Sequence, residues 1–151
     1  MRKKSSSQQK QPAKQYADFL RGIKLIGLAL GKCSASLDRG LYFARDRSDK
    51  SVRTISVDYK LADVKKDYFD VSAQFRLTVE DKTKPVVALT IDCEFVGHFH
   101  CGTADVPREF ADRFTQSELR LILWPYFREF VSDITSKMSI PPVLIPLGTA
   151  D

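Results

Sequence analysis

Alternation between apolar and polar positions dominates the middle of the chain. Residues 69–79 carry an apolar side chain at every odd position, and the even positions between them are polar or charged. Residues 87–101 repeat this pattern over a length that is unusual for a strand, and residues 55–61 show it over a shorter one. A period of two is typical of a strand that buries one face and exposes the other. Three strands are therefore predicted, and the short turn at residues 81–85 joins two of them as an antiparallel hairpin.

The first part of the chain changes from helical to strand spacing. Its apolar residues fall at intervals of three and four and then at every second position: Tyr16, Phe19, Leu20 and Ile23, followed by Ile26, Leu28 and Leu30. The alternation then continues on odd positions at Cys33, Ala35 and Leu37. Such a slip exchanges the two faces of a strand, and a β-bulge near Gly31 would restore a common inward face. We predict a short helix from Gln15 that leads into a bulged strand.

Residues 41–53 show no clear period. The stretch opens with the apolar residues Leu41, Tyr42 and Phe43 and continues as a charged run through Arg53. It is interpreted as a connection between strands with an apolar patch at its start. Large apolar side chains in a connection are candidates for contact with another molecule.

The last predicted element is a long helix. Thr115 and Glu118 have the spacing of a capping box, in which each side chain satisfies a free backbone N–H group, so the helix is expected to begin at Thr115. One apolar stripe follows at helical spacing, and a second set widens it: Leu119, Ile122, Tyr126, Phe130, Ile134 and Met138, with Leu123, Phe127 and Val131. Pro125 favours a bend or a restart inside the helix, which is expected to end before Pro141.

Strands followed by a terminal helix indicate an α+β fold, in which a four-stranded antiparallel sheet carries the long C-terminal helix on one face. This helix is apolar around more of its circumference than one packed face requires. A contact between subunits is the simplest use for the second apolar face. The candidate interface residues lie in the first turns of the apolar stripe: Leu119, Ile122, Leu123 and Tyr126.

The net charge of +5 comes entirely from the N-terminal end. Residues 1–14 contain five basic residues and no acidic one, which leaves 19 basic and 19 acidic residues in the rest of the chain. A short basic and polar segment has too few apolar side chains to offset the entropy of ordering it. Residues 1–14 are therefore predicted to form a disordered tail and residues 15–151 a single domain. A solvated tail is favoured over an arm for nucleic acid or another anionic partner.

Side chains that could carry chemistry gather in residues 92–101, but they belong to different faces. On a strand, Cys93 and Cys101 point to the apolar face, whereas His98 and His100 point to the polar one. This separation argues against a four-ligand zinc site and against a Cys–His nucleophilic pair. The glycines also lack the spacing of a phosphate-binding loop. We expect no metal, no cofactor and no catalysis, and the three cysteines, Cys33 included, are interpreted as reduced, packed thiols.

The chain contains no uninterrupted run of about 18 apolar residues, which a membrane-spanning helix needs. The residues after the basic start are polar, where a signal peptide has its apolar core. A cytoplasmic protein that does not insert into the membrane is therefore expected.

The predicted C-terminal helix resembles that of the SecB chaperones. Residues 123–134 read Leu-Trp-Pro-Tyr-Phe-Arg-Glu-Phe-Val-Ser-Asp-Ile, and in SecB proteins Pro-Tyr-(Ala)-Arg-Glu and a following Ser recur at this spacing. Residues 141–146, Pro-Pro-Val-Leu-Ile-Pro, are similar to the Phe-Pro-(Pro)-Leu-x-Leu segment of the family. The order of elements also agrees, with four alternating strands ahead of the helix. The resemblance covers residues 16–147 in layout and is specific from Leu123 onwards.

The resemblance implies an ATP-independent holding chaperone, organised as a dimer of dimers, whose apolar grooves bind unfolded polypeptides and keep them competent for export. SecB passes such preproteins to the SecA motor, and divergent SecB-like proteins protect an antitoxin within toxin–antitoxin modules. Binding of this kind needs exposed apolar side chains on a rigid scaffold. The candidate client-binding residues lie on the strand side and on the helical side: Leu41, Tyr42, Phe43, Tyr59, Phe127, Phe130, Val143, Leu144 and Ile145.

The chain departs from SecB in charge. SecB is acidic and docks SecA through acidic surface, whereas this domain is formally neutral and its tail is basic, which weakens the expectation of a handover to SecA. Two other hypotheses stand beside the chaperone. One is an adaptor for a single partner, or a nucleic-acid-binding protein, that uses residues 1–14 and whose binding would weaken steeply with salt. The other is a metal or thiol enzyme centred on residues 93–101.

Overall fold

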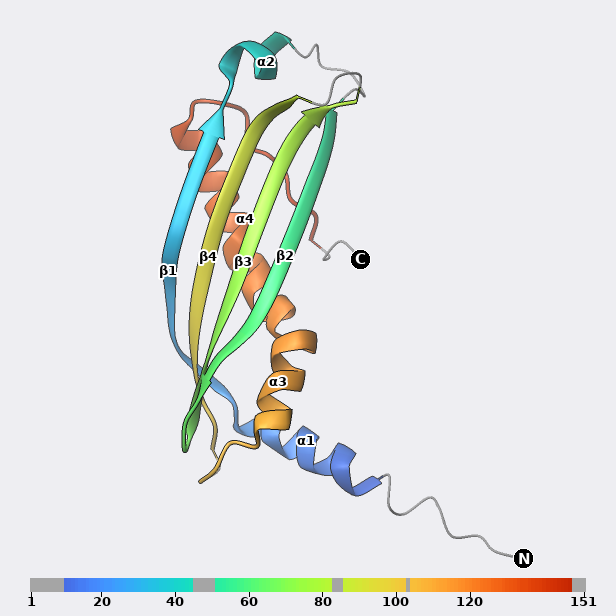
Figure 1. Ribbon diagram of the computed structural model, residues 1–151, viewed down its shortest axis with the longest axis vertical. Helices are drawn as coiled ribbons and strands as arrows, with labels where there is room; N and C mark the ends of the chain where they lie inside the picture. The colour runs from blue at the N-terminus through green and yellow to red at the C-terminus, as the bar shows by residue number, and fades with distance from the viewer. Residues whose placement is uncertain (1–9, 45–50, 83–85, 103, 148–151) are drawn as a thin grey trace, which may run out of the picture.

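The computed structural model describes residues 10–44, 51–82, 86–102 and 104–147. One antiparallel sheet has the strand order β1-β4-β3-β2 (Figure 1): β1 Lys24–Leu37, β2 Ser51–Val64, β3 Tyr68–Asp81 and β4 Val87–His100. The helices within the described residues are α1 Lys10–Gly22, α2 Arg39–Ala44, α3 Arg108–Ser117 and α4 Leu119–Lys137. Helices α3 and α4 follow one another along a single face of the sheet (Figure 1). The predicted α+β fold, a four-stranded antiparallel sheet with a long C-terminal helix, is confirmed.

The core lies between the sheet and α4. Every odd-numbered residue of 69–79 and of 89–99 is buried, and β3 and β4 pair antiparallel along their length, so the predicted alternation and hairpin are confirmed. Phe75 on this inner face stacks on Phe127 of α4, with ring centroids 4.5 Å apart. Aromatic rings from both layers therefore fill the space between the sheet and the helix.

The pairing of β1 with β4 is interrupted twice. One register shift falls between Leu30 and Lys32, so the bulge predicted near Gly31 is confirmed. A second shift surrounds Ile26 and was not predicted, because Leu25 and Ile26 are both apolar and leave no mark in the alternation. After each shift, the side chains that follow point to the opposite face of the sheet from the one that strict alternation would give them. Apolar side chains of β1 therefore return to the inner face.

Helix α2 occupies the place where we predict an irregular connection. Asp38 begins this helix, because its carboxylate accepts a hydrogen bond from the N–H of Leu41 at 2.9 Å and its carbonyl accepts one from the N–H of Tyr42 at 2.8 Å. The prediction that residues 41–44 lack regular structure is therefore wrong, since an aspartate N-cap precedes them. Strand β2 then starts at Ser51, and residues 45–50 lie outside the described residues.

Helix α1 begins at Lys10, five residues ahead of the predicted boundary between tail and domain. Residues 10–14, assigned to a disordered tail from the sequence, are therefore helical. The helical spacing of Tyr16 and Phe19 is confirmed, because both side chains are buried against the body of the protein. The rest of the predicted tail, residues 1–9, lies outside the described residues.

Two helices take the place of the single helix predicted after β4. Helix α3 starts at Arg108, and Thr115 is buried within it, with its hydroxyl donating to the carbonyl of Ala111 at 2.8 Å. The predicted helix start at Thr115 is therefore wrong, because its hydroxyl bonds back inside a helix instead of capping one. The two helices meet at Glu118, and α4 continues through Pro125 without a restart.

The end of α4 contains a strained residue. Within the described residues, Ser139 is the one non-glycine residue with a positive φ, 55°. The N–H group of Ile140 bonds to the carbonyl of Thr135 at 3.2 Å, as in a helix end where glycine normally occupies the left-handed position. Ser139→Gly is expected to raise the free energy of unfolding by roughly 0.5–1 kcal/mol, because glycine adopts this conformation without a steric penalty. Chemical denaturation checks the result, and an equal gain in Ser139→Ala would contradict the explanation.

Tyr16 carries a buried hydroxyl between α1 and α3. Its Oη finds no hydrogen-bond partner among the described residues, and the guanidinium carbon of Arg113 lies 4.0 Å from the centre of its ring. Burial, with the charge of Glu118 second, raises the pKa of Tyr16 above 10.0, and the charge of Arg113 opposes this. The folded state therefore favours the neutral phenol.

Tyr16→Phe is expected to raise the free energy of unfolding by about 1 kcal/mol at neutral pH, because it removes a buried polar atom that makes no hydrogen bond. Since the folded-state pKa is raised, the wild type keeps its full stability below pH 10 and loses part of it as the pH rises beyond that value. Urea titrations of both proteins between pH 8 and pH 11 check this. Parallel pH profiles above pH 10 would contradict it.

Candidate interaction surface

The helical layer leaves one edge of the inner sheet face open. Strand β1 directs apolar residues to this face, and we call this set the β1 strip: Leu28, Leu30, Cys33, Ala35 and Leu37. Leu30 is 44% exposed, and Cys33 and Ala35 are exposed as well. The expectation that Cys33 is packed is therefore wrong, because its strand lies at the uncovered edge of the sheet. Leu30 pairs with Phe95 of β4, which is buried and meets Phe130 of α4 edge to face at 6.2 Å. The core is therefore closed over β3 and β4, whereas the strip beside it remains partly uncovered.

Helix α2 adds two aromatic side chains at the end of β1. Tyr42 and Phe43 meet edge to face with centroids 5.6 Å apart, and the Phe43 ring is 53% exposed. Arg39 joins this helix to α4, because its Nη1 donates to the carbonyl of Met138 at 2.9 Å and its guanidinium carbon lies 5.5 Å from the Phe43 ring centre. Phe43 is thus presented to solvent on a helix whose position is fixed by α4.

The candidate client-binding residues divide into exposed and buried ones. Leu41, Tyr42, Tyr59 and Phe130 are half-buried, and Leu144 is 76% exposed. Three others belong to the core: Phe127, Val143 and Ile145. Their burial leaves them no surface for a client in this conformation. Burial also raises the pKa of Tyr59, with the charge of Arg120 opposing it, so its hydroxyl stays neutral at physiological pH.

The C-terminal segment after α4 folds back and is fastened to that helix. The indole Nε1 of Trp124 donates to the carbonyl of Pro146 at 2.8 Å, and Nε of Arg128 donates to the carbonyl of Ile145 at 3.1 Å. These bonds hold alternate side chains against the core and turn Leu144 and Leu147 to solvent. The segment therefore offers apolar surface only at its outward positions.

The candidate interface residues on α4 are also divided. Leu119 and Leu123 are fully buried in the core, Ile122 is half-buried and Tyr126 is exposed. Leu121 is 64% exposed and was missed, although it stands between two members of the predicted stripe. An apolar residue that breaks the helical period is the signal that could have identified it.

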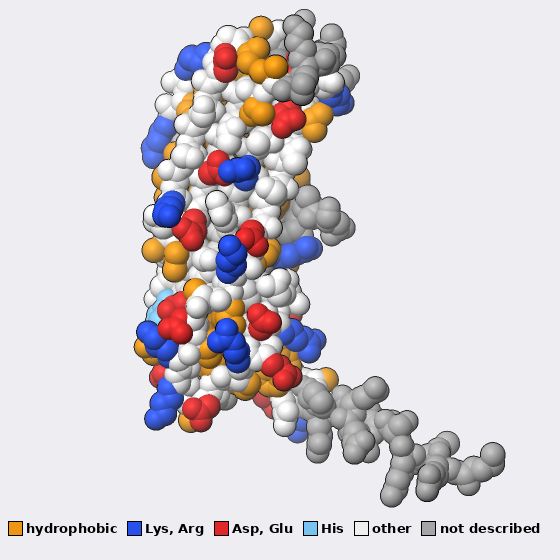
Figure 2. Space-filling model, viewed as in Figure 1, with side chains coloured by type: hydrophobic (Ala, Val, Ile, Leu, Met, Phe, Trp, Pro, Cys, Tyr) orange, Lys and Arg blue, Asp and Glu red, His pale blue; other side chains and the backbone are white. Residues whose placement is uncertain are grey.

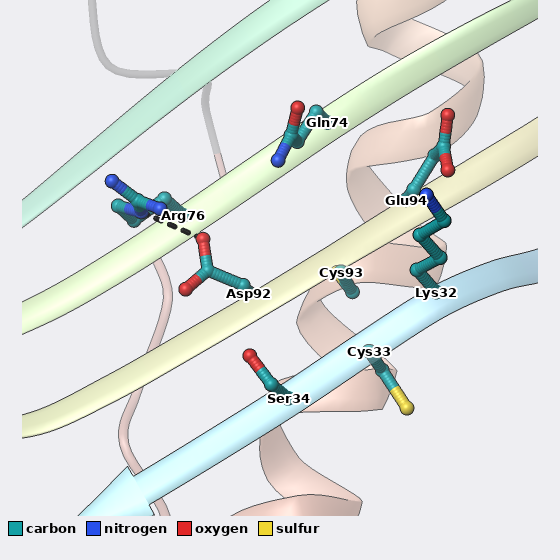
Figure 3. Close-up of a pocket in the computed structure, with 8 residues that line it drawn as sticks. All are labelled: Lys32, Cys33, Ser34, Gln74, Arg76, Asp92, Cys93 and Glu94. Carbon is teal, nitrogen blue, oxygen red and sulfur yellow. Dashed lines mark hydrogen bonds and ion pairs between the residues drawn. The ribbon is translucent and has the colours of Figure 1, made fainter.

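The outer face of the sheet is polar. A shallow hollow of about 630 Å³ lies over β1, β4 and β3, and the Nε of Arg76 bonds to Oδ1 of Asp92 at 2.6 Å within it (Figure 3). Figure 2 shows acidic and basic side chains interspersed over this face. Asp58 likewise pairs with Lys60 at 3.2 Å. The outer face of the described sheet therefore carries paired acidic and basic side chains, and it does not form a patch of a single charge.

The residues of the candidate metal or thiol site face opposite ways, as predicted. Cys93 and Cys101 are buried on the inner side, whereas the side chains of His98 and His100 are partly exposed. His98 Nδ1 contacts Asp70, and Nε2 of His100 lies 3.7 Å from Asp67. Among the residues that the structure describes, no three His, Cys, Asp or Glu side chains gather as a metal site would require.

No helix within the described part of the chain is long and apolar enough to cross a membrane.

Comparisons with known proteins agree with the fold. The family model described as preprotein translocase subunit SecB matches residues 43–147. A SecB-like chaperone from Mycobacterium tuberculosis, solved with a ChAD peptide of the HigA1 antitoxin, is similar at 21% identity and a TM-score of 0.67, covering 89% of this chain and 96% of that one. A protein of unknown function from Streptococcus agalactiae has 12% identity and a TM-score of 0.47, covering 83% and 97%. The curated proteins contain no match.

Proposed function

Because this chain belongs to the SecB family, we propose that it is a holding chaperone, which binds non-native polypeptides on exposed apolar surface without nucleotide and without a catalytic step. The observation that carries the proposal is the open β1 strip beside Phe43 of α2. Unfolded chains offer scattered apolar side chains and free backbone groups rather than a fixed shape. An uncovered apolar strip on an edge strand suits both, because its free N–H and C=O groups lie along the same path.

The client proposed is a non-native polypeptide of the export or antitoxin class. The similar chaperone from Mycobacterium tuberculosis carries an antitoxin peptide, which supports a dedicated client as one form of this function. The outer face pairs Asp92 with Arg76 and Asp58 with Lys60, so it offers little unpaired acidic surface for the SecA motor. Handover to SecA is therefore not part of the proposal, and the proposed location is the cytoplasm.

Self-association as a dimer of dimers is part of the same proposal. Exposed apolar side chains lie on the edge strand and on the outer side of α4, at Ile26, Leu121 and Tyr126. Large apolar side chains left exposed on two separate elements are candidates for contacts between subunits. A dimer of dimers requires two different interfaces, and these two surfaces could supply them. The mass of the protein in solution tests this part.

The chaperone proposal is tested by diluting a denatured model protein into buffer with and without this chain, in the absence of ATP. Suppressed aggregation is expected. Leu30→Ser and Phe43→Ser should each bind the model protein about tenfold more weakly, since each loses the burial of one large apolar side chain in the complex. Val96→Ser is the matched control, because Val96 is exposed to a similar degree but lies on the polar outer face.

A chain that leaves aggregation unchanged would contradict a general holding function and would leave a chaperone for one dedicated client. Equal effects of all three substitutions would show that the apolar contacts are not confined to the β1 strip and α2. Binding that falls steeply with salt would instead support the nucleic-acid or anionic-partner hypothesis for the basic residues 1–14.

A further inference from the structure

Two cysteines face one another across the open edge of the sheet. Cys33 of β1 and Cys93 of β4 are register partners in the antiparallel pairing, and both lie on the inner face. Directly opposed residues of antiparallel strands have Cα atoms about 4.5–5.5 Å apart. Disulfides accept Cα separations of roughly 4.4–6.8 Å. The backbone therefore already holds these two residues at a separation that a disulfide can bridge.

The two thiols differ sharply in access. Cys33 is exposed, and in Figure 3 its sulfur points away from β4 towards the free side of β1. Cys93 is only 2% exposed and lies beneath the sheet. Burial raises the pKa of Cys93 from 9.0 to about 12, with the nearby Cys33 and Asp92 adding to the rise. A dissolved oxidant therefore meets Cys33 first, whereas Cys93 is shielded by burial and by its small thiolate fraction.

The backbone of β1 near Cys33 has the freedom to adjust when a disulfide to Cys93 forms. The register shift between Leu30 and Lys32 ends immediately before Cys33, and a bulged strand bends at the extra residue. Strand β1 is also at the edge of the described sheet, so β4 is its one neighbouring strand there. Rotation of the Cys33 side chain towards β4 is the movement that the bridge requires.

We propose that Cys33 and Cys93 form a thiol–disulfide exchange site that takes a small disulfide of the glutathione class. The Cys33 thiolate attacks one sulfur of oxidised glutathione, the sulfur–sulfur bond of glutathione breaks, and one glutathione leaves as a thiolate that takes up a proton. The Cys93 thiolate then attacks the Cys33 sulfur and displaces the second glutathione. Two protein thiols are oxidised to one disulfide, and one glutathione disulfide is reduced to two thiols.

The first step leaves no thiolate at Cys33 that could oppose the ionisation of Cys93, because a mixed disulfide carries no charge at sulfur. Attack from a register partner is also intramolecular, which compensates for a small thiolate fraction.

The test mixes the reduced full-length chain with oxidised glutathione and follows intact mass and peptide maps after rapid acid quenching. Wild type should show a transient glutathione adduct at Cys33 and then a species lighter by two hydrogen atoms, with Cys33 joined to Cys93. Cys93→Ala should stop at the adduct. Cys33→Ser should take up glutathione at least about tenfold more slowly, because the remaining buried thiols are poor reactants. Cys101→Ser, the matched control, should behave as wild type.

Several outcomes would overturn the proposal. A stable adduct in the wild type would show that Cys93 does not resolve it. A bridge between Cys33 of two chains would place the partner thiol in another copy, and a bridge to Cys101 would exclude the register pair. The wild-type measurement needs no substitution, so it stands even where a core variant folds poorly. It also involves no client, so its failure leaves the chaperone proposal untouched.

Discussion

Phe127→Ala is expected to lower the free energy of unfolding by about 3–5 kcal/mol. The ring is fully buried between sheet and helix, stacks on Phe75 at 4.5 Å and lies 5.8 Å from the ring of Trp124. Truncation removes the transfer free energy of the ring and leaves a cavity that rigid neighbours on two layers cannot fill. Urea-induced unfolding followed by circular dichroism measures the change.

Glu129→Ala is the matched control for this substitution. Glu129 lies two residues after Phe127 on the same helix, is exposed and belongs to neither proposed surface, so its loss should change the free energy of unfolding by less than about 1 kcal/mol. A small effect at Phe127 would mean that the core rearranges around the vacancy. Such a result would also support Phe127 as a client-binding residue, because a core that rearranges could expose its side chain to a client.

The second large effect is expected at Gly97, near the C-terminal end of β4. A Cβ atom there would lie 3.0 Å from Cε2 of Phe99 and 3.1 Å from Cγ2 of Val71, closer than ordinary packing allows. Gly97→Ala should therefore lower the free energy of unfolding by about 1–3 kcal/mol, because a methyl group is forced into a filled core.

Gly27→Ala provides the opposite control on the neighbouring strand. A Cβ atom at Gly27 would lie 3.7 Å from the nearest atom, the Cβ of His98, which is an ordinary contact. Alanine there should be neutral or stabilising by up to about 1 kcal/mol, since glycine loses more conformational freedom on folding. Thermal unfolding of both variants separates crowding from backbone entropy, and equal losses would refute the steric explanation.

The strands and one bulge follow directly from the sequence, because a period of two reports which residues face the core. The slip of that period around Gly31 is visible because Leu28 and Leu30 stand at even positions before it, whereas polar residues occupy the even positions after it. The shift at Ile26 is invisible because two apolar neighbours, Leu25 and Ile26, satisfy either register. Bulges can thus be predicted only where the residues on their two faces differ in polarity.

Helix α3 could not be located from its capping signal. Thr115 and Glu118 match a capping box in spacing, but tertiary packing buries Thr115 and gives its hydroxyl an internal acceptor. The helical spacing of Phe110 and Phe114 was a signal for the earlier start at Arg108. The spacing of the apolar residues Phe110 and Phe114 was thus a better guide to the start of the helix than the capping-box spacing of Thr115 and Glu118.

The interaction surface was only partly predictable for a geometric reason. The sequence identifies Phe43 and Ile145 equally as apolar, yet one is exposed on α2 and the other is buried by the returning C-terminal segment. Which apolar side chains stay uncovered depends on how α4 crosses a sheet wider than itself. The exposure of Leu30 results from that crossing and has no counterpart in local sequence pattern.

The strand order has a consequence for how the chain folds. Strands β2, β3 and β4 pair with their neighbours in sequence, whereas β1 must reach across all of β2 and β3 to pair with β4. Contacts that close long loops form late, and β1 also has the least cover from helices. Strand β1 should therefore dock last and open first, as a separate cooperative unit whose amide hydrogens exchange with solvent sooner than those of β3.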